Sequence, residues 1–160
     1  MKHILRSCAL LLILFAGTAQ AEYPQLPDFR LPTTQGEISS AKLNNQVVYV
    51  DFWASWCKPC QKSFPFLNEL QARYAKQGLT VLGINLDKDH NAASSFLQRV
   101  PAHFTVAFDQ QGNIAQQFHV QGMPSSYLVD RKGNIRARHI GFREEDKAKL
   151  EQAVTSLLKE

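Results

Sequence analysis

Two cysteines separated by two residues follow closely after an apolar segment, and this pair constrains the chain more than any other feature. The apolar segment is Val47–Trp53, and the pair is Cys57 and Cys60. A nearly continuous apolar run of this length predicts a strand that is covered on both faces. A C-x-x-C pair placed after such a strand, where a helix begins, is typical of a redox dithiol rather than of a metal site.

The spacing of the pair predicts its chemistry. If Cys57 starts a helix, Cys60 lies about one turn further on, and the two thiols can close into a disulfide without backbone movement. The positive end of the helix favours an anion by roughly 0.3–2 kcal/mol, which can lower a thiol pKa from about 8.5 towards about 7. Lys58 adds a neighbouring positive charge, and Pro59 suits the first turn of a helix. Cys57 is therefore predicted to be a nucleophilic thiolate.

Three other interpretations of the pair compete with a redox dithiol. A purely structural disulfide would close a ring of four residues, which removes only about 2 kcal/mol of chain entropy. A structural zinc site would need a second Cys or His pair, and the histidines beyond the first residues are scattered, without the required spacing: His90, His103, His119 and His139. Covalent haem attachment needs a histidine after the second cysteine, where Gln61 stands, so only this third interpretation is excluded.

The N-terminus is typical of a secretory signal. Lys2 and Arg6 precede residues 8–17, which are nearly all apolar and are followed by a small-x-small site ending at Ala21. The apolar stretch is short for a membrane span, which needs about 20 residues. We therefore expect residues 1–21 to be a signal peptide cleaved after Ala21, with an uncleaved membrane anchor as the alternative.

The remaining chain, residues 22–160, is long enough for one domain. Removal of the predicted signal takes Lys2 and Arg6 and no acidic residue, which lowers the formal net charge from +4 to +2. Such a mild charge does not argue for nucleic acid binding. Export leads to a compartment that permits disulfides. Because Cys57 and Cys60 are then the only cysteines, we expect them to act on the disulfides of other proteins.

Hydrophobic periodicity predicts alternating strands and helices. A β-hairpin is expected near the N-terminus, at residues 29–31 and 36–38, and Asp130–Asn134 is the turn of a second hairpin. We further expect strands at residues 47–53, 80–86, 105–108, 126–129 and 135–139, and helices at 58–76, 91–99, 113–118 and 144–158. The expected fold class is α/β, with a mixed central β-sheet and helices on both faces.

Several segments together resemble known proteins. The run from Val50 to Cys60, Pro65 in the following helix and the tripeptide Gly122-Met123-Pro124 resemble the active-site region of thioredoxins. The export signal and residues 83–87, 91–99 and 127–130 with Gly133 are similar to the TlpA/ResA branch of periplasmic thioredoxin-like proteins. This resemblance extends from about residue 26 to the C-terminus. It implies a thioredoxin fold with an N-terminal β-hairpin extension and an inserted helix.

The resemblance also implies roles for individual residues. Cys57 corresponds to the attacking cysteine, with an exposed sulfur, which forms a mixed disulfide with a client protein. Cys60 corresponds to the buried cysteine that resolves this intermediate. Pro124 corresponds to a cis-proline that faces the dithiol. Met123 corresponds to the residue whose backbone pairs with an extended client segment, as in β-strand addition.

Asp51 interrupts the apolar run at 47–53, so its carboxylate is expected to be buried and its pKa raised. It matches the buried acid of thioredoxins and could exchange a proton with Cys60. Trp56 is expected to shield the disulfide or to form part of the client-binding surface, together with Lys58 and Pro59.

The predicted function is an exported thiol–disulfide oxidoreductase that reduces disulfides of periplasmic client proteins. Possible clients include apocytochrome c, and a membrane thiol reductase would supply electrons. No cofactor, metal or nucleic acid is expected, and membrane contact is expected only if the signal stays uncleaved.

Two positions depart from the family pattern. The dipeptide Lys58-Pro59 replaces the Gly-Pro of thioredoxin, which leaves the direction of electron flow open. Ser125 and Ser126 follow Pro124, where cytochrome-specific DsbE-like members usually have Glu. A peroxidase of the peroxiredoxin kind and a non-enzymatic chaperone or assembly factor are the alternative functions.

Overall fold

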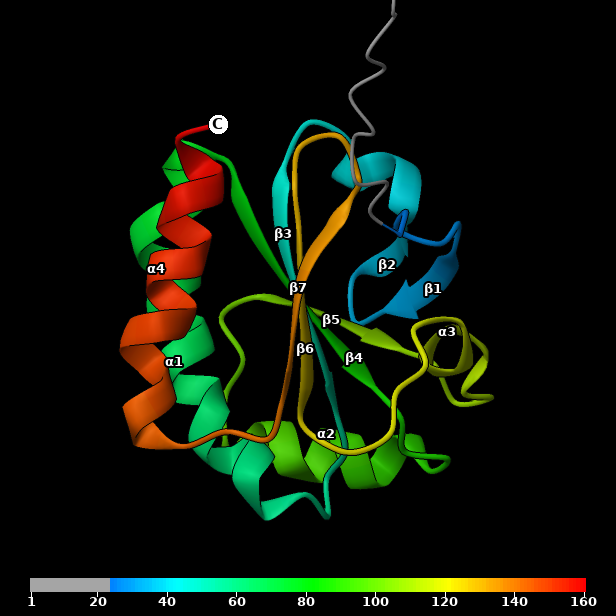
Figure 1. The fold of residues 1–160 in the computed structure, drawn as a ribbon. Helices are drawn as coiled ribbons and strands as arrows, with labels where there is room; N and C mark the ends of the chain where they lie inside the picture. The colour runs from blue at the N-terminus through cyan, green and yellow to red at the C-terminus, as the bar shows by residue number, and fades with distance from the viewer. Residues whose placement is uncertain (1–23) are drawn as a thin grey trace, which may run out of the picture.

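A seven-stranded mixed sheet forms the centre of the computed structural model, which describes residues 24–160 (Figure 1). The predicted signal peptide, residues 1–21, lies outside the described residues. The strands are β1 (Arg30–Thr33), β2 (Gly36–Ser39), β3 (Val47–Trp53), β4 (Leu79–Asn85), β5 (Thr105–Phe108), β6 (Ser125–Val129) and β7 (Ile135–Ile140). The helices are α1 (Lys58–Tyr74), α2 (His90–Arg99), α3 (Asn113–Gln117) and α4 (Lys147–Leu158), with short 3₁₀ turns η1 (Ser40–Leu43), η2 (Ala75–Gln77) and η3 (Glu144–Asp146).

The order of the strands is β2-β1-β5-β4-β3-β6-β7, and this arrangement confirms the predicted fold. β3 pairs in parallel with β4, to which α1 connects it, and in antiparallel fashion with β6. The two predicted hairpins are β1–β2 and β6–β7. The fold is a thioredoxin fold with an N-terminal hairpin and an inserted helix, α2.

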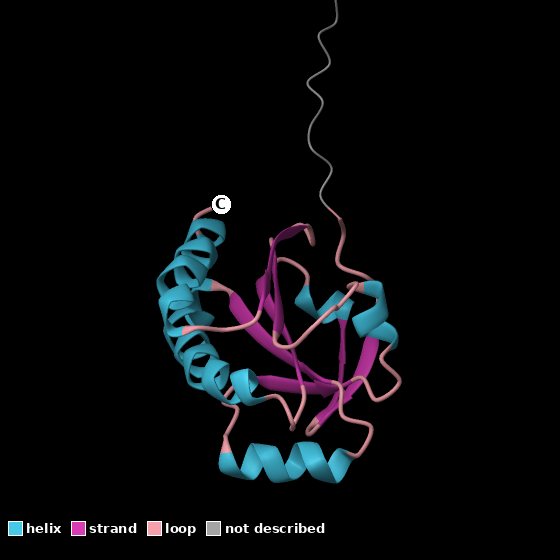
Figure 2. Cartoon of the chain, turned by 60° about the horizontal axis from the view of Figure 1, so that its bottom comes forward, coloured by secondary structure: helices cyan, strands magenta, loops and turns pink. Residues whose placement is uncertain are grey.

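Side chains alternate along β3 and so contribute to two separate hydrophobic clusters. Trp53 packs against Phe64 of α1 and Phe96 of α2, with ring centroids 5.0 and 4.7 Å apart. Phe52 points to the opposite face, where it contacts Phe118 and Tyr127 at 5.1 and 5.8 Å. Figures 1 and 2 show α1 and α4 on one side of the sheet and α3 on the other.

The predicted elements are present, and the differences lie at their ends. β4 begins one residue before the predicted strand and ends one residue before its predicted end. α1 continues through Pro65 but ends at Tyr74, and η2 then leads to Gly78, whose φ of +94° closes the turn. The predicted C-terminal helix divides into η3 and α4, since the Asp146 carboxylate accepts a hydrogen bond from the Arg143 N–H at 3.1 Å.

Within residues 24–160, no helix has both the length and the apolar character that are needed to cross a membrane.

Candidate active site

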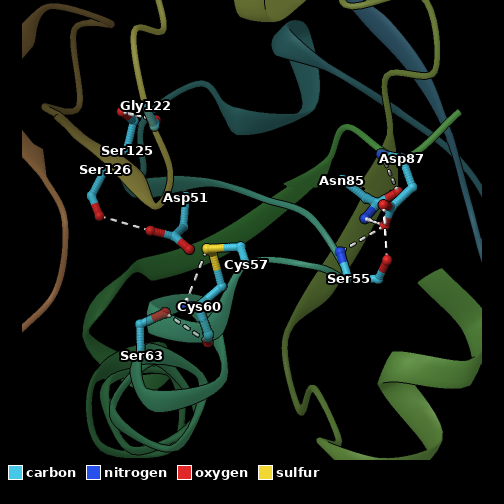
Figure 3. Close-up of a disulfide and its surroundings, with 10 residues drawn as sticks. All are labelled: Asp51, Ser55, Cys57, Cys60, Ser63, Asn85, Asp87, Gly122, Ser125 and Ser126. Carbon is cyan, nitrogen blue, oxygen red and sulfur yellow. Dashed lines mark hydrogen bonds between the residues drawn. A yellow bond between two sulfur atoms is a disulfide. The ribbon is translucent and has the colours of Figure 1, made fainter. Parts of the chain in front are cut away.

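The cysteine pair lies where the chain passes from β3 into α1. Cys57 is the N-cap of α1, and its sulfur accepts a hydrogen bond from the Cys60 N–H at 3.3 Å. The two sulfurs form a disulfide across the first turn of the helix, with Cα atoms 5.3 Å apart (Figure 3). Pro59 lies in this first turn, as predicted, where it removes no helical hydrogen bond. One N–H group of the first helical turn, that of Cys60, therefore lies against the sulfur of Cys57.

Exposure differs sharply among the residues of this segment. The Trp56 side chain is 70% exposed, and Lys58 and Pro59 are also exposed. Cys60 is fully buried, as expected, but only 4% of Cys57 is exposed. The expectation of an exposed Cys57 sulfur is therefore wrong for the disulfide form. Its sulfur is bonded to Cys60, and the residue packs within the hydrophobic cluster on the α1 face.

The loop that precedes β6 contacts the hydrophobic cluster that contains both cysteines, through the side chain of Met123. The Met123–Pro124 peptide bond is cis, as the resemblance implied. The Gly141 N–H donates to the Pro124 carbonyl at 2.8 Å, and Ser125 Oγ donates to the Gly122 carbonyl at 2.7 Å. Within the described part of the chain, the Met123 backbone has no backbone hydrogen-bond partner. These contacts hold the loop while leaving Met123 available to another chain.

Asp51 is buried behind the disulfide, with 1% of its surface exposed. Its Oδ1 accepts a hydrogen bond from Ser126 Oγ at 2.7 Å, and its Oδ2 has no hydrogen-bond partner among the described residues. Figure 3 shows the carboxylate directed toward the cysteine pair. Burial raises the pKa of Asp51 from 3.8 to about 7, although the hydrogen bond from Ser126 lowers it. The predicted burial and its effect on the pKa are confirmed.

Tyr49 lies two residues before Asp51 on the same face of β3. Burial raises the pKa of its phenol, and the nearby Asp51 carboxylate raises it further. Tyr49 is therefore a neutral hydrogen-bonding group at physiological pH and carries no charge near the site.

A second polar network, which the sequence analysis missed, fixes the segment before Cys57. Asp87 accepts hydrogen bonds from both the N–H and the Oγ of Ser55, each at 2.9 Å, and from Asn85 Nδ2 at 2.7 Å. Figure 3 shows this network on the far side of the disulfide from Asp51. Polar residues at the end of an otherwise apolar strand were the available signal, because parallel strands end at the same edge of a sheet.

Ser126 was noted in the sequence only because it follows Pro124 in place of a glutamate. The structure places it directly opposite Asp51 in the pairing of β3 with β6. Opposite residues on paired strands have neighbouring side chains on one face. The sequence alone does not specify this register, so the contact could not be predicted.

An open groove of about 620 Å³ begins at Trp56 and continues past Met123 to α3. Its other apolar lining comes from Leu86, Ala115 and Val120. The groove joins the predicted client-contacting residues Trp56 and Met123 in one continuous surface.

The histidines named for the zinc alternative do not form a metal site among residues 24–160. His90 packs against Phe108, and His139 lies 3.4 Å from Asp146. Among residues 24–160, no three His, Cys, Asp or Glu side chains gather as a metal site would require.

This geometry supports one kind of chemistry. A disulfide at a helix N-terminus can be attacked and re-formed, and a buried acid with a pKa near neutrality can take up or release the accompanying proton. The class defined by this fold and site is the thioredoxin-fold thiol–disulfide oxidoreductases. Comparison with known families narrows the class further: the Redoxin family profile matches residues 21–154, and the chain belongs to this family.

Individual relatives agree with the family match. The thiol-disulfide oxidoreductase ResA of Bacillus cereus is 31% identical over 128 residues, which are 79% of this chain and 73% of the relative. The thioredoxin-like protein YneN of Bacillus subtilis is 35% identical over 124 residues, 75% and 72% of the two chains. A Chlorobium tepidum structure assigned as the thiol:disulfide interchange protein DsbE has a TM-score of 0.83 and 46% identity, covering 85% of this chain and 96% of that one. The protein is thus a ResA/DsbE-like thiol–disulfide oxidoreductase.

Proposed function

We propose that this protein reduces disulfide bonds of exported client proteins in the periplasm. The observation that carries the proposal is the Cys57–Cys60 disulfide at the start of α1, next to Trp56, which lines one groove together with Met123. The names of the relatives support thiol–disulfide exchange in general. The predicted signal peptide, residues 1–21, supports the location.

In the reductive direction the reaction begins from the dithiol form. The Cys57 thiolate attacks one sulfur of the client disulfide, which forms a mixed disulfide and releases the other client sulfur as a thiolate. Cys60 gives its proton to Asp51 and then attacks Cys57. The Cys57–Cys60 bond forms, the second client sulfur leaves, and protons complete two client thiols. Two electrons pass from the protein dithiol to the client.

The helix start and the exposed residues around it support the assignment of Cys57 as the attacking cysteine. Cys57 retains 4% exposure while Cys60 has none, and only Cys57 has the N-cap position. The partial positive charge of the helix end stabilises a thiolate there. Lys58 places a further positive charge beside it. Once Cys57 is linked to a client, Cys60 lies within one helical turn and completes the exchange.

Client recognition is assigned to the groove next to the disulfide. An extended client segment would form hydrogen bonds with the Met123 backbone, and its apolar side chains would contact Trp56. Such backbone recognition accepts many sequences, which suits a reductase with several clients. Apocytochrome c is one candidate, since its C-x-x-C-H haem-binding segments carry paired cysteines.

Each turnover leaves the protein as a disulfide, so it needs a source of electrons. We propose a membrane thiol reductase that attacks Cys57 from the periplasmic side. The same exposed residues, Trp56, Lys58 and Pro59, would then contact donor and client in turn.

The test uses residues 22–160 with Cys57→Ser and Cys60→Ser. Cys57→Ser should abolish disulfide reduction, whereas Cys60→Ser should accumulate mixed disulfides with clients, seen by mass spectrometry. The reverse pattern would contradict the assignment of the attacking cysteine.

The direction of electron flow is tested by the reduction potential, measured in thiol–disulfide buffers of known poise. A value near that of thioredoxin, about −270 mV, is expected for a reductase, and a value near about −120 mV would mark an oxidant instead.

A further inference from the structure

The two oxygens of the buried Asp51 carboxylate have different environments. Oδ1 accepts the hydroxyl hydrogen of Ser126 at 2.7 Å. Oδ2 is buried and has no hydrogen-bond partner among residues 24–160. In Figure 3 one oxygen is bonded to Ser126 and the other is directed toward the Cys57–Cys60 pair. A buried acceptor without a partner is costly, so its presence beside a redox-active pair points to a function.

Ser126 is well placed to create this difference. It is buried, with 6% of its surface exposed, and it lies opposite Asp51 in the ladder of β3 and β6. Its neighbour Ser125 is bonded instead to Gly122 in the cis-proline loop. No other side chain in the described part of the chain forms a hydrogen bond with Asp51.

We propose that Ser126 is a positioning residue for proton transfer, because its bond to Oδ1 keeps Oδ2 as the atom that accepts the Cys60 proton. The inference rests on the proposed function. A carboxylate oxygen that already accepts a hydrogen bond is the weaker proton acceptor of the two. The same bond holds the carboxylate in the orientation that directs Oδ2 to the cysteines.

The proton step balances as follows. The Cys60 S–H bond breaks, its proton passes to Oδ2, and the electron pair stays on Cys60 as a thiolate. The thiolate forms the Cys57–Cys60 bond and displaces the client sulfur, which leaves with the electron pair of the mixed disulfide. Asp51, now neutral, returns the proton from Oδ2 when the disulfide is reduced again.

The other groups around Asp51 do not replace Ser126 in this role. Tyr49 on β3 is a buried neutral phenol with a raised pKa. Gly83 lies opposite on β4 and has no side chain. His139 on β7 lies opposite Ser126, beyond it from Asp51, and faces Asp146 of η3 at 3.4 Å.

The experiment uses residues 22–160 with Ser126→Ala, Ser126→Thr and Ser40→Ala. Ser40 is a matched control, because its buried hydroxyl also donates to a carboxylate, Asp28 Oδ1 at 3.1 Å, on a segment distant in sequence from the cysteines. The first readout is the titration of Asp51 in the disulfide form, followed by NMR of its carboxyl carbon. The second is the pH dependence of client-disulfide reduction in a single turnover.

Ser126→Ala should raise the titration midpoint of Asp51 by about one pH unit, since one unit corresponds to about 1.4 kcal/mol, the order of one hydrogen bond to a charged group. The pH–rate profile should move by the same amount, and the plateau rate should fall several-fold. Ser126→Thr, which keeps the hydroxyl, should restore both. Ser40→Ala should leave both unchanged.

Two results would overturn the inference. One is an Asp51 titration that Ser126→Ala leaves in place, and the other is a slower reaction at every pH without a shift of the profile, which would indicate a packing role. Failure of the proposed function has a different signature. The NMR titration needs no client, so it can show the Ser126 effect even where the wild-type protein reduces no disulfide.

Discussion

The two faces of the sheet share strand β3 but differ in what they bury. On the face covered by α3, the rings of Phe52, Phe118 and Tyr127 lie 4.9–5.8 Å apart. The one polar group of this trio, the Tyr127 hydroxyl, donates to the Phe118 carbonyl at 2.7 Å. The face covered by α1 and α4 also has an aromatic cluster, around Trp53, and it adds a disulfide and the buried Asp51, which has one carboxylate oxygen without a hydrogen-bond partner among residues 24–160. The buried carboxylate beside α3, that of Asp109, instead accepts hydrogen bonds from the N–H groups of Ile114 and Ala115.

The difference extends to hydrogen bonding. Three buried side-chain atoms lack a hydrogen-bond partner among residues 24–160: Asp51 Oδ2, Trp53 Nε1 and His139 Nε2. Asp51 and Trp53 alternate with Phe52 on β3, and the strand register places His139 on the same face as Asp51. All three therefore lie on the α1 and α4 face. His139 Nε2 faces the Asp146 carboxylate at 3.4 Å, whereas Asp51 Oδ2 is directed toward the disulfide. Of the three atoms, Asp51 Oδ2 is therefore the one that the proposed chemistry uses.

The largest expected effect is a loss of stability on the α3 face that leaves the chemistry of the other face unchanged. Phe52→Ala should lower the free energy of unfolding by about 3–5 kcal/mol, because it removes a fully buried ring and leaves a cavity. The titration of Asp51 and the reduction potential of the disulfide should stay unchanged. Denaturant unfolding and carboxyl NMR measure the two quantities. A shifted Asp51 titration would show that the faces are coupled and would contradict the comparison.

Asp51→Asn tests the α1 and α4 face and should have the next largest effect. The pKa of Asp51 is raised to about 7 in the folded protein, so the folded state binds more protons than the unfolded state between pH 4 and 7. Stability of the wild type should therefore fall as pH rises through this window. Asp51→Asn should remove this pH dependence. Above pH 7, the free energy of unfolding of Asp51→Asn should exceed that of the wild type by up to about 4 kcal/mol.

The measurement is denaturant unfolding of the disulfide form of both proteins from pH 4 to pH 8. Asp28→Asn, at an exposed carboxyl group, is the control and should leave the pH profile unchanged. Parallel stability curves for wild type and Asp51→Asn would show that burial does not raise the pKa of Asp51.

Much of the fold could be predicted from the sequence, because its strongest signals are local. The continuous apolar run of β3 and the helical spacing in α1 each identify an element without reference to any other. The residues at which elements begin and end were predicted less accurately than the elements themselves. η3 separates from α4 through the side chain of Asp146, which is a contact that periodicity does not report.

In the active site, too, the features with local sequence signals were predicted and the contacts between distant segments were not. Cys57, Cys60 and the buried Asp51 were predicted, because the spacing of the two cysteines and the acid within an apolar strand are patterns in the sequence itself. The contacts of Ser126 and of Asp87 could not be predicted, because they depend on which residues paired or adjacent strands bring together. The near burial of Cys57 was missed for a related reason, since the disulfide and its packing determine it.

The smallest expected effect on stability is that of a substitution at Trp56. This substitution tests whether the exposed apolar side chain next to the disulfide binds clients. Because this side chain is 70% exposed, Trp56→Ala should change the free energy of unfolding by less than about 0.5 kcal/mol. The KM for client disulfides should nevertheless rise about tenfold, as for an aromatic residue at the centre of an interface. Trp56→Phe, which keeps a ring, should restore most of the affinity. Steady-state reduction of a disulfide-containing peptide measures KM. If KM stayed at the wild-type value in Trp56→Ala, the client would not contact this surface, and the groove beside Met123 would have no role in recognition.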